Sequence, residues 1–225
     1  MTSCRGYFIT GTDTGVGKTV VTLGLMAYLQ ALGQTVAGMK PVASGCERSA
    51  EGLVNEDALQ LQRQSSVALP YALVNPYALE PPIAPHIAAA RAGVTISIDT
   101  IRSTFDVIAA RADCVLVEGV GGWQVPLNSG ETLAHLAGAL ELDVILVVGL
   151  RLGCLSHALL TAESIVSSGC SPAGWVANRL PPVADATEEN INTLKSRLSF
   201  PFLGVVPPLE RLQPRRVAGC LSLPF

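Results

Sequence analysis

Short apolar runs rich in β-branched residues recur along the chain, separated by longer segments of a different pattern. The six clearest runs predict strands at residues 7–10, 35–41, 114–119, 144–150, 173–178 and 202–207. Several of them are apolar at nearly every position instead of alternating between apolar and polar. Continuous apolarity indicates burial on both faces, which is typical of a parallel sheet covered by helices on each side.

The segments between these runs carry apolar residues at helical spacing. They predict helices at residues 18–32, 56–64, 85–91, 99–111, 132–140, 155–168 and 187–198. Strands alternating with helices indicate a doubly wound α/β fold, with a mainly parallel sheet and helices on both faces. Such folds bind ligands beyond the carboxyl ends of their strands. Residues 65–85 are proline-rich, aromatic and irregular, and we expect them to form an ordered excursion over the surface.

Composition narrows the class of protein. The 225 residues are 49% apolar and 15% charged, which excludes a disordered chain and fits a single domain spanning residues 1–225. A formal net charge of −3 gives no electrostatic reason to expect nucleic acid or an anionic membrane as a partner. Neither a secretory signal nor an apolar run of roughly 18 residues is evident, so we expect a cytoplasmic protein.

Cysteine and histidine residues show no pattern of a metal site. The six cysteines are Cys4, Cys46, Cys114, Cys154, Cys170 and Cys220, and no two of them have C-x-x-C spacing. We therefore expect reduced thiols and no metal cluster. His135 and His157 lie on predicted apolar helices, where we expect them to be core residues.

The turn after the first strand, GTDTGVGKT at residues 11–19, has the composition of a phosphate-binding loop. The usual spacing G-x-x-x-x-G-K-[ST] would place its first glycine at position 12, but Thr12 stands there and Gly11 comes one residue earlier. The longer loop keeps its backbone N–H groups, the helix N-terminus and the Lys18 charge for phosphate oxygens. Thr19 can place its hydroxyl on Mg²⁺. This combination predicts a P-loop NTPase fold with a nucleotide-phosphate site.

A second cationic position follows the second strand, in the segment KPVASG. Lys18 and Lys40 are two of only three lysines in the chain, and each closes one of the first two strands. We expect Lys40 to face a second anion or a transferred phosphoryl group, with the Ser44 hydroxyl nearby. The alternative is a lysine that is merely solvated at the end of a strand.

Two carboxylates complete a candidate metal site. Glu118 ends the most apolar strand, where an acid can reach the Mg²⁺ of a phosphate loop directly or through water. The glycines of GVGG after it add N–H donors for an oxyanion. Asp57 opens a predicted helix, so it is either a metal ligand or an ordinary first-turn acid favoured by the helix dipole.

The segment RLGCLSH follows the fourth strand and starts another predicted helix. The N–H groups of Gly153, Cys154, Leu155 and Ser156 can therefore bind a carboxylate. The alternative is a plain helix N-terminus capped by the Ser156 side chain.

Together these motifs resemble those of the dethiobiotin synthetase family over nearly the whole chain. The shared segments, in the family's order and spacing, are GTDTGVGKT, KPVASG, NEDALQLQ, VNPYALEPPIAPHIAA, VEGVGGW, VILVVGLRLGCLSHALLT and GWVANR. The tail after Leu209 departs from the family pattern. The resemblance implies an enzyme of biotin biosynthesis that uses ATP as co-substrate and Mg²⁺ as cofactor. It implies closure of a cyclic urea from 7,8-diaminononanoate and CO₂, through a carbamate and a mixed carbamic-phosphoric anhydride, with release of ADP and phosphate.

The resemblance also implies a role for each matching residue. The catalytic residues would be Lys40 and Lys18, and the Mg²⁺ ligands would be Thr19, Asp57 and Glu118. Thr14, Lys40 and Ser44 would contact the diamine or its carbamate. ATP would be bound by Gly15, Val16, Gly17, Lys18, Thr19 and Val20, by Glu118, Gly119, Val120 and Gly121, and, around adenine, by Asn178, Arg179, Pro207, Pro208 and Leu209. The family is homodimeric, and Gly153, Cys154, Leu155 and Ser156 would reach the substrate carboxylate across the subunit interface.

Two other functions fit parts of the pattern. One is a partitioning or membrane-site-selecting ATPase of the ParA or MinD kind, which acts as an assembly switch. Such proteins carry a signature lysine five residues before Lys18, where this chain has Asp13, and the chain lacks a basic or amphipathic membrane-binding tail. The other is a small-molecule kinase, but kinases usually cover the phosphates with arginines in a mobile lid, and no arginine-rich lid is apparent.

Overall fold

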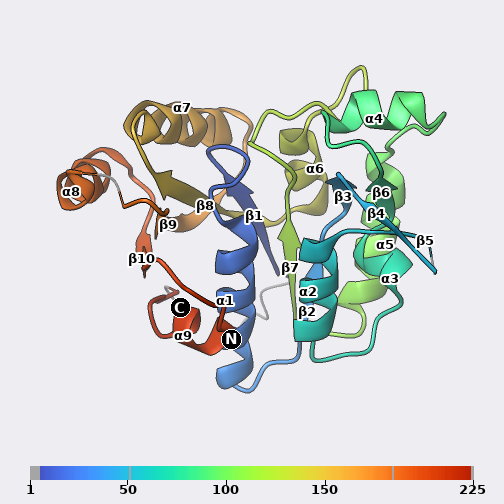
Figure 1. Ribbon diagram of the computed structural model, residues 1–225, viewed down its shortest axis with the longest axis horizontal. Helices are drawn as coiled ribbons and strands as arrows, with labels where there is room; N and C mark the ends of the chain where they lie inside the picture. Colours follow the sequence, from blue (N-terminus) through green and yellow to red (C-terminus); the bar gives the residue numbers. More distant parts are fainter. Residues whose placement is uncertain (1–5, 51, 184, 224–225) are drawn as a thin grey trace.

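The computed structural model describes residues 6–50, 52–183 and 185–223, and its centre is a six-stranded sheet (Figure 1). The strand order is β10-β9-β8-β1-β7-β2, and every neighbouring pair is parallel. These strands are β1 (Gly6–Gly11), β2 (Val36–Met39), β7 (Cys114–Glu118), β8 (Asp143–Leu150), β9 (Pro172–Arg179) and β10 (Phe202–Val206). The sheet confirms the predicted α/β fold, and each of its strands overlaps one predicted run.

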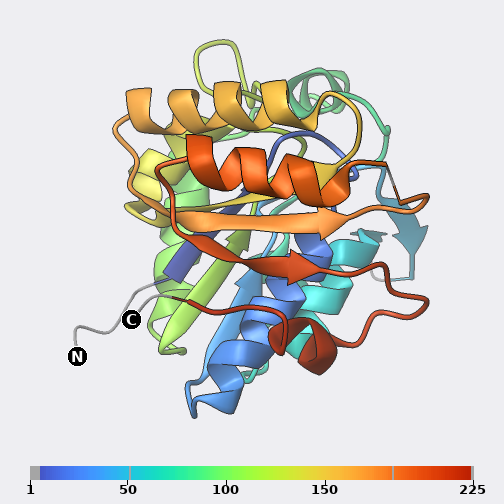
Figure 2. The same cartoon turned by 90° about the vertical axis from the view of Figure 1, so that its left-hand side faces the viewer.

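Helices cover both faces of the sheet, as predicted. One face carries α1 (Lys18–Ala31), α2 (Glu56–Gln64) and α9 (Pro214–Ala218), and the other carries α5 (Ile98–Ala109), α6 (Leu133–Leu140), α7 (Cys154–Ser167) and α8 (Thr187–Arg197). Figure 2 shows α7 and α8 above β9 and β10, with α1 and α9 below them. This division follows from right-handed crossovers, because the chain runs from β1 toward the β2 edge and then back toward β10. None of the described helices has the length and hydropathy needed to cross a lipid bilayer.

The reversal of chain direction beside β1 determines where a ligand can bind. β1 lies between β7 and β8, and Ile9 is aligned with Glu118 across the β1–β7 pair. The carboxyl ends of β1, β2 and β7 therefore lie at one edge of the sheet. Lys40 follows β2 directly and Glu118 ends β7, so the fold brings both to the switch point where doubly wound proteins bind ligands.

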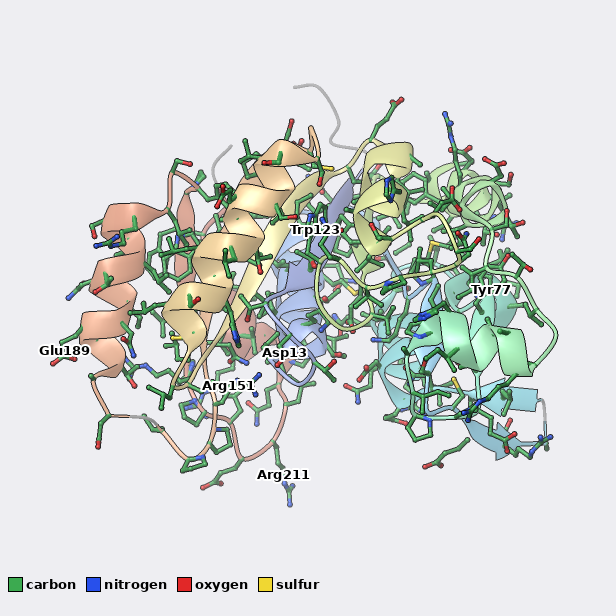
Figure 3. All side chains as sticks on the ribbon, turned by 90° about the horizontal axis from the view of Figure 1, so that it is seen from above. Asp13, Tyr77, Trp123, Arg151, Glu189 and Arg211 are labelled. Carbon is green, nitrogen blue, oxygen red and sulfur yellow. The ribbon has the colours of Figure 1, made fainter. Side chains whose placement is uncertain are left out.

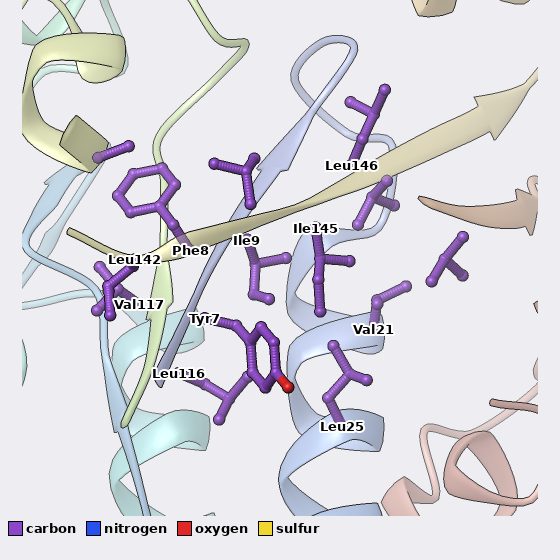
Figure 4. Packing of buried hydrophobic residues seen from close by; sticks show 14 of the residues in the cluster. Tyr7, Phe8, Ile9, Val21, Leu25, Leu116, Val117, Leu142, Ile145 and Leu146 are labelled. Atoms are coloured by element: carbon purple, nitrogen blue, oxygen red, sulfur yellow. The ribbon is translucent and has the colours of Figure 1, made fainter. Parts of the chain in front are cut away.

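The core forms where β1 packs against α1. Tyr7 and Ile9 point toward α1, where Val21 and Leu25 lie, and Phe8 points to the opposite face (Figure 4). There the Phe8 ring meets Trp123 edge to face, with ring centroids 6.2 Å apart. Burying an aliphatic or aromatic side chain of this size stabilises the fold by about 1.5–3 kcal/mol.

The expectation of a surface excursion at residues 65–85 is wrong in part. This segment forms α3 (Tyr71–Val74) and β6 (Tyr77–Leu79), and β6 pairs in parallel with β3 (Val42–Ser44) in a second, two-stranded sheet. Val74 is fully buried. The hairpin of β4 (Glu47–Ser49) and β5 (Gly52–Val54) and the helix α4 (Pro85–Arg91) complete this region. Elements of three or four residues are too short to show a period in the sequence, which is why the pattern missed them.

The expectation that His135 and His157 are core residues is also wrong, because both side chains are exposed. His135 completes a capping box at the start of α6, where the backbone N–H of Thr132 donates to His135 Nδ1 at 3.0 Å. Both helices are largely apolar, but each histidine falls on the stripe that faces solvent. No disulfide joins cysteines within the described ranges, and Cys4 lies outside them.

Candidate active site

The phosphate loop joins the end of β1 to the start of α1. Gly15 and Gly17 have φ angles of +73° and +88°, a region that favours glycine. Gly17 is also the N-cap residue of α1, so the N–H groups of the first helical turn open toward the loop. A Cβ atom on Gly17 would lie 2.0 Å from Asn178 Nδ2. The loop is therefore packed closely against the end of β9.

Asn178 supports this loop from β9, which lies two strands away from β1 in the same sheet. Its side chain is buried, and its Nδ2 donates to the carbonyl oxygen of Val16 at 2.8 Å. The two residues are 162 positions apart in sequence, so no local pattern could have signalled the contact. The role expected for Asn178 at adenine stays a prediction.

Lys18 folds back over the loop that precedes it. Its Nζ donates to the carbonyl oxygens of Gly121, at 2.7 Å, and Asp13, at 3.0 Å. Burial lowers the pKa of Lys18 from 10.5 to about 8. The ammonium is thus held by two neutral carbonyls in a poorly hydrated position, where an arriving anion would be a stronger partner.

Lys40 lies between two carboxylates. Its Nζ donates to Glu118 Oε1 at 2.5 Å and to Asp57 Oδ2 at 2.9 Å. Lys40 is 5% exposed and Glu118 is 1% exposed, whereas the Asp57 side chain is 41% exposed. The alternative of a merely solvated Lys40 is therefore wrong, since the ammonium is the buried counter-ion of this acid pair.

The charges of this cluster set the ionisation of Lys40 and Asp57. Burial by itself lowers the pKa of Lys40, but the carboxylates of Glu118 and Asp57 outweigh it, so the pKa lies above its usual value. For Asp57 burial raises the pKa, and the Lys40 ammonium overcomes this effect and holds the pKa below its usual value. Both groups therefore stay charged near neutral pH.

Glu118 has a buried oxygen that is suited to a further cation. Its Oε1 accepts hydrogen bonds from Lys40 and from the Thr19 hydroxyl, the latter at 2.9 Å. Its Oε2 is buried and has no hydrogen-bond partner among the described residues. A buried carboxylate oxygen without a donor fits a hard divalent cation such as Mg²⁺. No three His, Cys, Asp or Glu side chains of the described chain converge as a metal site, so such an ion would also need Thr19 and ligand oxygens.

These groups line one cavity of about 400 Å³ at the carboxyl edge of the sheet. The predicted site residues that it brings together are Thr14, Gly15, Gly17, Lys18, Thr19, Val20, Lys40, Ser44, Asp57, Glu118, Val120 and Gly121. The Ser44 hydroxyl is buried without a hydrogen-bond partner in the described chain, and Ser44 lines the same cavity. Both lysines thus converge on one space.

Three further lining residues were not expected from the sequence: Asn55, Gln60 and Leu212. Asn55 is the N-cap of α2, where its side chain accepts from the N–H of Ala58 at 3.2 Å. An asparagine before a helical run is a recognised start signal, so Asn55 could have been found. Leu212 belongs to the tail beyond Leu209, and nothing in the local sequence marks it.

The remaining predicted residues do not line this cavity. They are Val16, Gly119, Asn178, Arg179, Pro207, Pro208, Leu209 and the segment from Gly153 to Ser156. Val16 belongs to the loop and its side chain is buried, and the Arg179 guanidinium pairs with Glu188. Pro208 lines a separate cavity of about 340 Å³ with Glu210 and Arg211.

The segment after β8 is tied to the phosphate loop by one ion pair. The Arg151 guanidinium donates to the Asp13 carboxylate, and Figure 3 shows the two side chains next to each other. The N-cap residue of α7 is Gly153, with no side-chain cap, so the alternative of a Ser156 cap is wrong. Leu152, just before it, is fully exposed.

A larger cavity of about 930 Å³ lies between α1, α2 and α9, lined by residues such as Gln30, Gln64 and Arg215. None of its lining residues belongs to the charge cluster. Leu212 lines both cavities. We therefore assign the active site to the smaller cavity, because the charged residues line it.

Comparison with known proteins agrees with this assignment. Residues 5–216 match a family model described as an AAA domain. Among solved structures, a chain of the MinC:MinD cell division protein complex of Aquifex aeolicus aligns with a TM-score of 0.58 at 18% identity, over 94% of this chain and 85% of that one. The signal recognition particle receptor FtsY of Elizabethkingia anophelis aligns with a TM-score of 0.53 at 16% identity, over 97% of this chain and 61% of that one. These similarities show the P-loop NTPase type of fold and nothing finer.

Sequence relatives are much closer. The ATP-dependent dethiobiotin synthetase BioD of Pseudomonas aeruginosa (strain UCBPP-PA14) is 51% identical over 218 residues, covering 96% of both chains. The protein of the same name from Aromatoleum aromaticum is 49% identical over 224 residues and 100% of both chains, and that of Xanthomonas oryzae pv. oryzae (strain PXO99A) is 48% identical over 97% of both. With about half of its residues shared over nearly its full length, the chain belongs to the ATP-dependent dethiobiotin synthetase family.

Proposed function

We propose that this chain is an ATP-dependent dethiobiotin synthetase of biotin biosynthesis, a ligase that closes a cyclic urea. It joins CO₂ and the two amines of 7,8-diaminononanoate, and converts ATP to ADP and phosphate. The observation that carries the proposal is the convergence of Lys18, Thr19, Lys40, Asp57 and Glu118 on one cavity, in a chain that shares half its residues with named synthetases.

The reaction has three steps. One amine of the substrate adds CO₂ and loses a proton, which gives a carbamate. A carbamate oxygen then attacks the γ-phosphorus of ATP, so that ADP leaves and a mixed carbamic-phosphoric anhydride forms. The second amine attacks the carbamate carbon, the bond to the phosphate oxygen breaks, and dethiobiotin and inorganic phosphate are released.

The lysines supply most of the positive charge. Lys18 stabilises the β- and γ-phosphate oxygens, and its present carbonyl contacts are easily exchanged for them. Lys40 stabilises charge on the carbamate and on the transferred phosphoryl group. Thr14 and Ser44 contact the diamine or its carbamate, which the unpartnered Ser44 hydroxyl supports. Because little proton transfer needs an enzyme group, positioning and electrostatics dominate the acceleration.

Thr19, Asp57 and Glu118 would hold Mg²⁺. When bound, this ion neutralises charge on the phosphate oxygens. The free Oε2 of Glu118 and the half-exposed Asp57 support this assignment. Lys40 shares its carboxylate partners with the ion, so the ligand-free contacts of Lys40 rearrange when ATP enters.

Adenine is proposed to lie near Asn178, Arg179 and the segment Pro207 to Leu209. This region is at the end of β9 and β10, and Gly17 contacts Asn178, so a nucleotide on the loop would extend toward it. Gly15 to Val20 and Glu118 to Gly121 would surround the phosphates.

The active form is proposed to be a homodimer with the substrate site at the subunit interface. Gly153 to Ser156 would then bind the substrate carboxylate across that interface with their N–H groups. The fully exposed Leu152 and the exposed Leu160 and Val166 of α7 support burial of this face against a second copy.

The two alternatives have less support. Asp13 stands where an assembly-switch ATPase carries its signature lysine, and it pairs with Arg151 within the same chain. No arginine lines the 400 Å³ cavity among the described residues, which leaves a kinase lid without its usual charges.

Substrate dependence is the direct test. ADP release by the purified protein is expected to require both the diamine and bicarbonate, and dethiobiotin should appear by mass spectrometry in equal amount. Omitting either substrate should leave ATP intact. Steady ATP hydrolysis that responds to DNA or lipid and ignores the diamine would contradict the proposal and favour the assembly switch.

ATP affinity is expected to fall as the pH rises above about 8, by up to about tenfold per pH unit. The reason is that the pKa of Lys18 in the ligand-free protein is about 8, while bound phosphate favours the ammonium, so binding must take up a proton above that pH. Calorimetric titration of ATP at several pH values measures this. Lys18→Arg, whose guanidinium keeps its charge, should show no such fall, and an equal fall in both proteins would assign the effect elsewhere.

A further inference from the structure

Four hydrogen bonds and the short backbone segment 55–57 form a closed ring that includes Lys40. Two members of this ring, Tyr71 and Asn75, do not line the cavity. The side chain of Lys40 donates to Asp57 Oδ2 at 2.9 Å, and Asp57 lies in the first turn of α2. The N-cap residue of that helix, Asn55, donates its backbone N–H to the Tyr71 hydroxyl at 2.8 Å. The Tyr71 hydroxyl donates to Asn75 Oδ1 at 2.9 Å, and Asn75 Nδ2 returns to the Lys40 carbonyl at 2.7 Å.

The hydrogen bonds of this ring hold the Lys40 backbone and the start of α2, which carries Asp57, at separate points. Asn75 is 3% exposed, and the Lys40 N–H also donates to the Val74 carbonyl at 2.8 Å, so α3 and the residue after it hold the Lys40 backbone on both sides. The Tyr71 hydroxyl holds Asn55, the N-cap residue of α2, two positions before Asp57. Burial raises the pKa of the Tyr71 phenol, so its proton stays in place to donate to Asn75.

We propose that Tyr71 and Asn75 are positioning residues for the active site. They fix the start of α2 relative to the Lys40 backbone, and thereby set the distance between the Asp57 carboxylate and the Lys40 ammonium. The inference rests on the proposed roles of Asp57 as an Mg²⁺ ligand and Lys40 as a catalytic residue. Its physical basis is that groups behind a metal ligand fix its orientation, so their loss weakens metal binding although they never touch the ion.

The chain contains a matched control for this idea. The Tyr77 hydroxyl accepts from the backbone N–H of Ser97 at 3.1 Å, and Ser97 is the N-cap of α5. Tyr71 and Tyr77 thus make the same kind of bond to the N-cap residue of a helix. The difference is that α2 supplies Asp57 and Gln60 to the cavity, whereas α5 supplies none of its lining residues.

The experiment compares Tyr71→Phe with Tyr77→Phe, each of which removes one hydroxyl and keeps the ring. Calorimetry gives the dissociation constants of ADP with and without Mg²⁺, and their ratio reports the metal ligands without any turnover. In Tyr71→Phe this ratio is expected to shift about tenfold against the metal complex, with metal-free ADP binding unchanged, and kcat to fall about tenfold. Tyr77→Phe is expected to change both quantities by less than about twofold, at a similar loss of thermal stability.

Equal behaviour of the two variants would overturn the inference, because it would assign Tyr71 a purely structural role. Asn75→Leu is a second variant of similar shape; it removes both the acceptor for Tyr71 and the donor to the Lys40 carbonyl and adds no charge, so it should reproduce the shift in the ADP ratio. A wild-type Mg²⁺ preference in Asn75→Leu would also overturn it. Absence of diamine-dependent turnover in the wild-type protein would instead refute the proposed function, and the ADP ratio would still test the ring.

Discussion

Lys40→Ala is expected to lower kcat by roughly 100-fold, equivalent to about 3 kcal/mol of transition-state stabilisation, while ATP affinity changes little. The reason is geometric: Lys40 reaches the cavity from β2, and the phosphate loop with Lys18 is intact without it. The measurement is steady-state turnover with diamine, bicarbonate and ATP, together with calorimetric binding of ATP.

The same variant should be less stable without ligands. Lys40 is the buried counter-ion of Glu118, which is 1% exposed, and removing one partner of a buried pair costs about 3–5 kcal/mol of unfolding free energy. Thermal or urea unfolding of the ligand-free protein measures this loss. Turnover should therefore be measured at a temperature at which the variant is folded.

Lys195→Ala is the control for Lys40→Ala. Lys195 is the third lysine of the chain and lies on α8 with its ammonium 4.2 Å from the Phe202 ring centroid, outside the cavity. Its loss should leave kcat unchanged. A folded Lys40→Ala protein with wild-type kcat would remove Lys40 from the mechanism.

Gly17→Ala is expected to reduce the unfolding free energy by about 3 kcal/mol and to weaken ATP binding strongly. Two costs add up. The φ angle of +88° costs an L-residue about 1–2 kcal/mol, and the new methyl group would lie 2.0 Å from Asn178 Nδ2, which must move and give up its bond to Val16. Urea unfolding gives the stability, and calorimetry gives the ATP affinity.

Gly33→Ala separates these two costs. Gly33 follows α1 with a φ angle of +85°, and a Cβ atom there would meet nothing within 4 Å. The unfolding free energy of Gly33→Ala should therefore fall only by the conformational cost, about 1–2 kcal/mol, and its ATP affinity should equal that of the wild type. Equal losses of stability in the two variants would show that the Asn178 contact does not constrain the loop.

The homodimer, the cytoplasmic location and the individual site roles stay predictions. The family and the fold are shown, because both follow from features spread over the whole chain. The alternation of apolar runs with helical segments predicted the six-stranded sheet and its covering helices. The glycine-rich turn before Lys18 predicted the phosphate loop in spite of its extra residue.

The features that could be predicted from the order of the amino acids are those whose cause is local. A continuous apolar run predicts a buried strand because each of its residues must leave water, and glycines before Lys18 predict a loop because positive φ angles favour glycine. Long helices and central strands were therefore found. Elements such as α3 and β6, with three or four residues, were not found, because they depend on the neighbours against which they pack.

Contacts between distant residues depend instead on how the strands and helices pack in three dimensions. Lys40 and Glu118 are 78 positions apart, Lys18 and Gly121 are 103 apart, and Asn178 reaches Val16 across 162. Those pairings exist because right-handed crossovers bring the carboxyl ends of nonconsecutive strands to one edge of a sheet. For the same reason His135 and His157 were misplaced: a helical pattern gives the spacing of an apolar face, but only packing decides where that face ends.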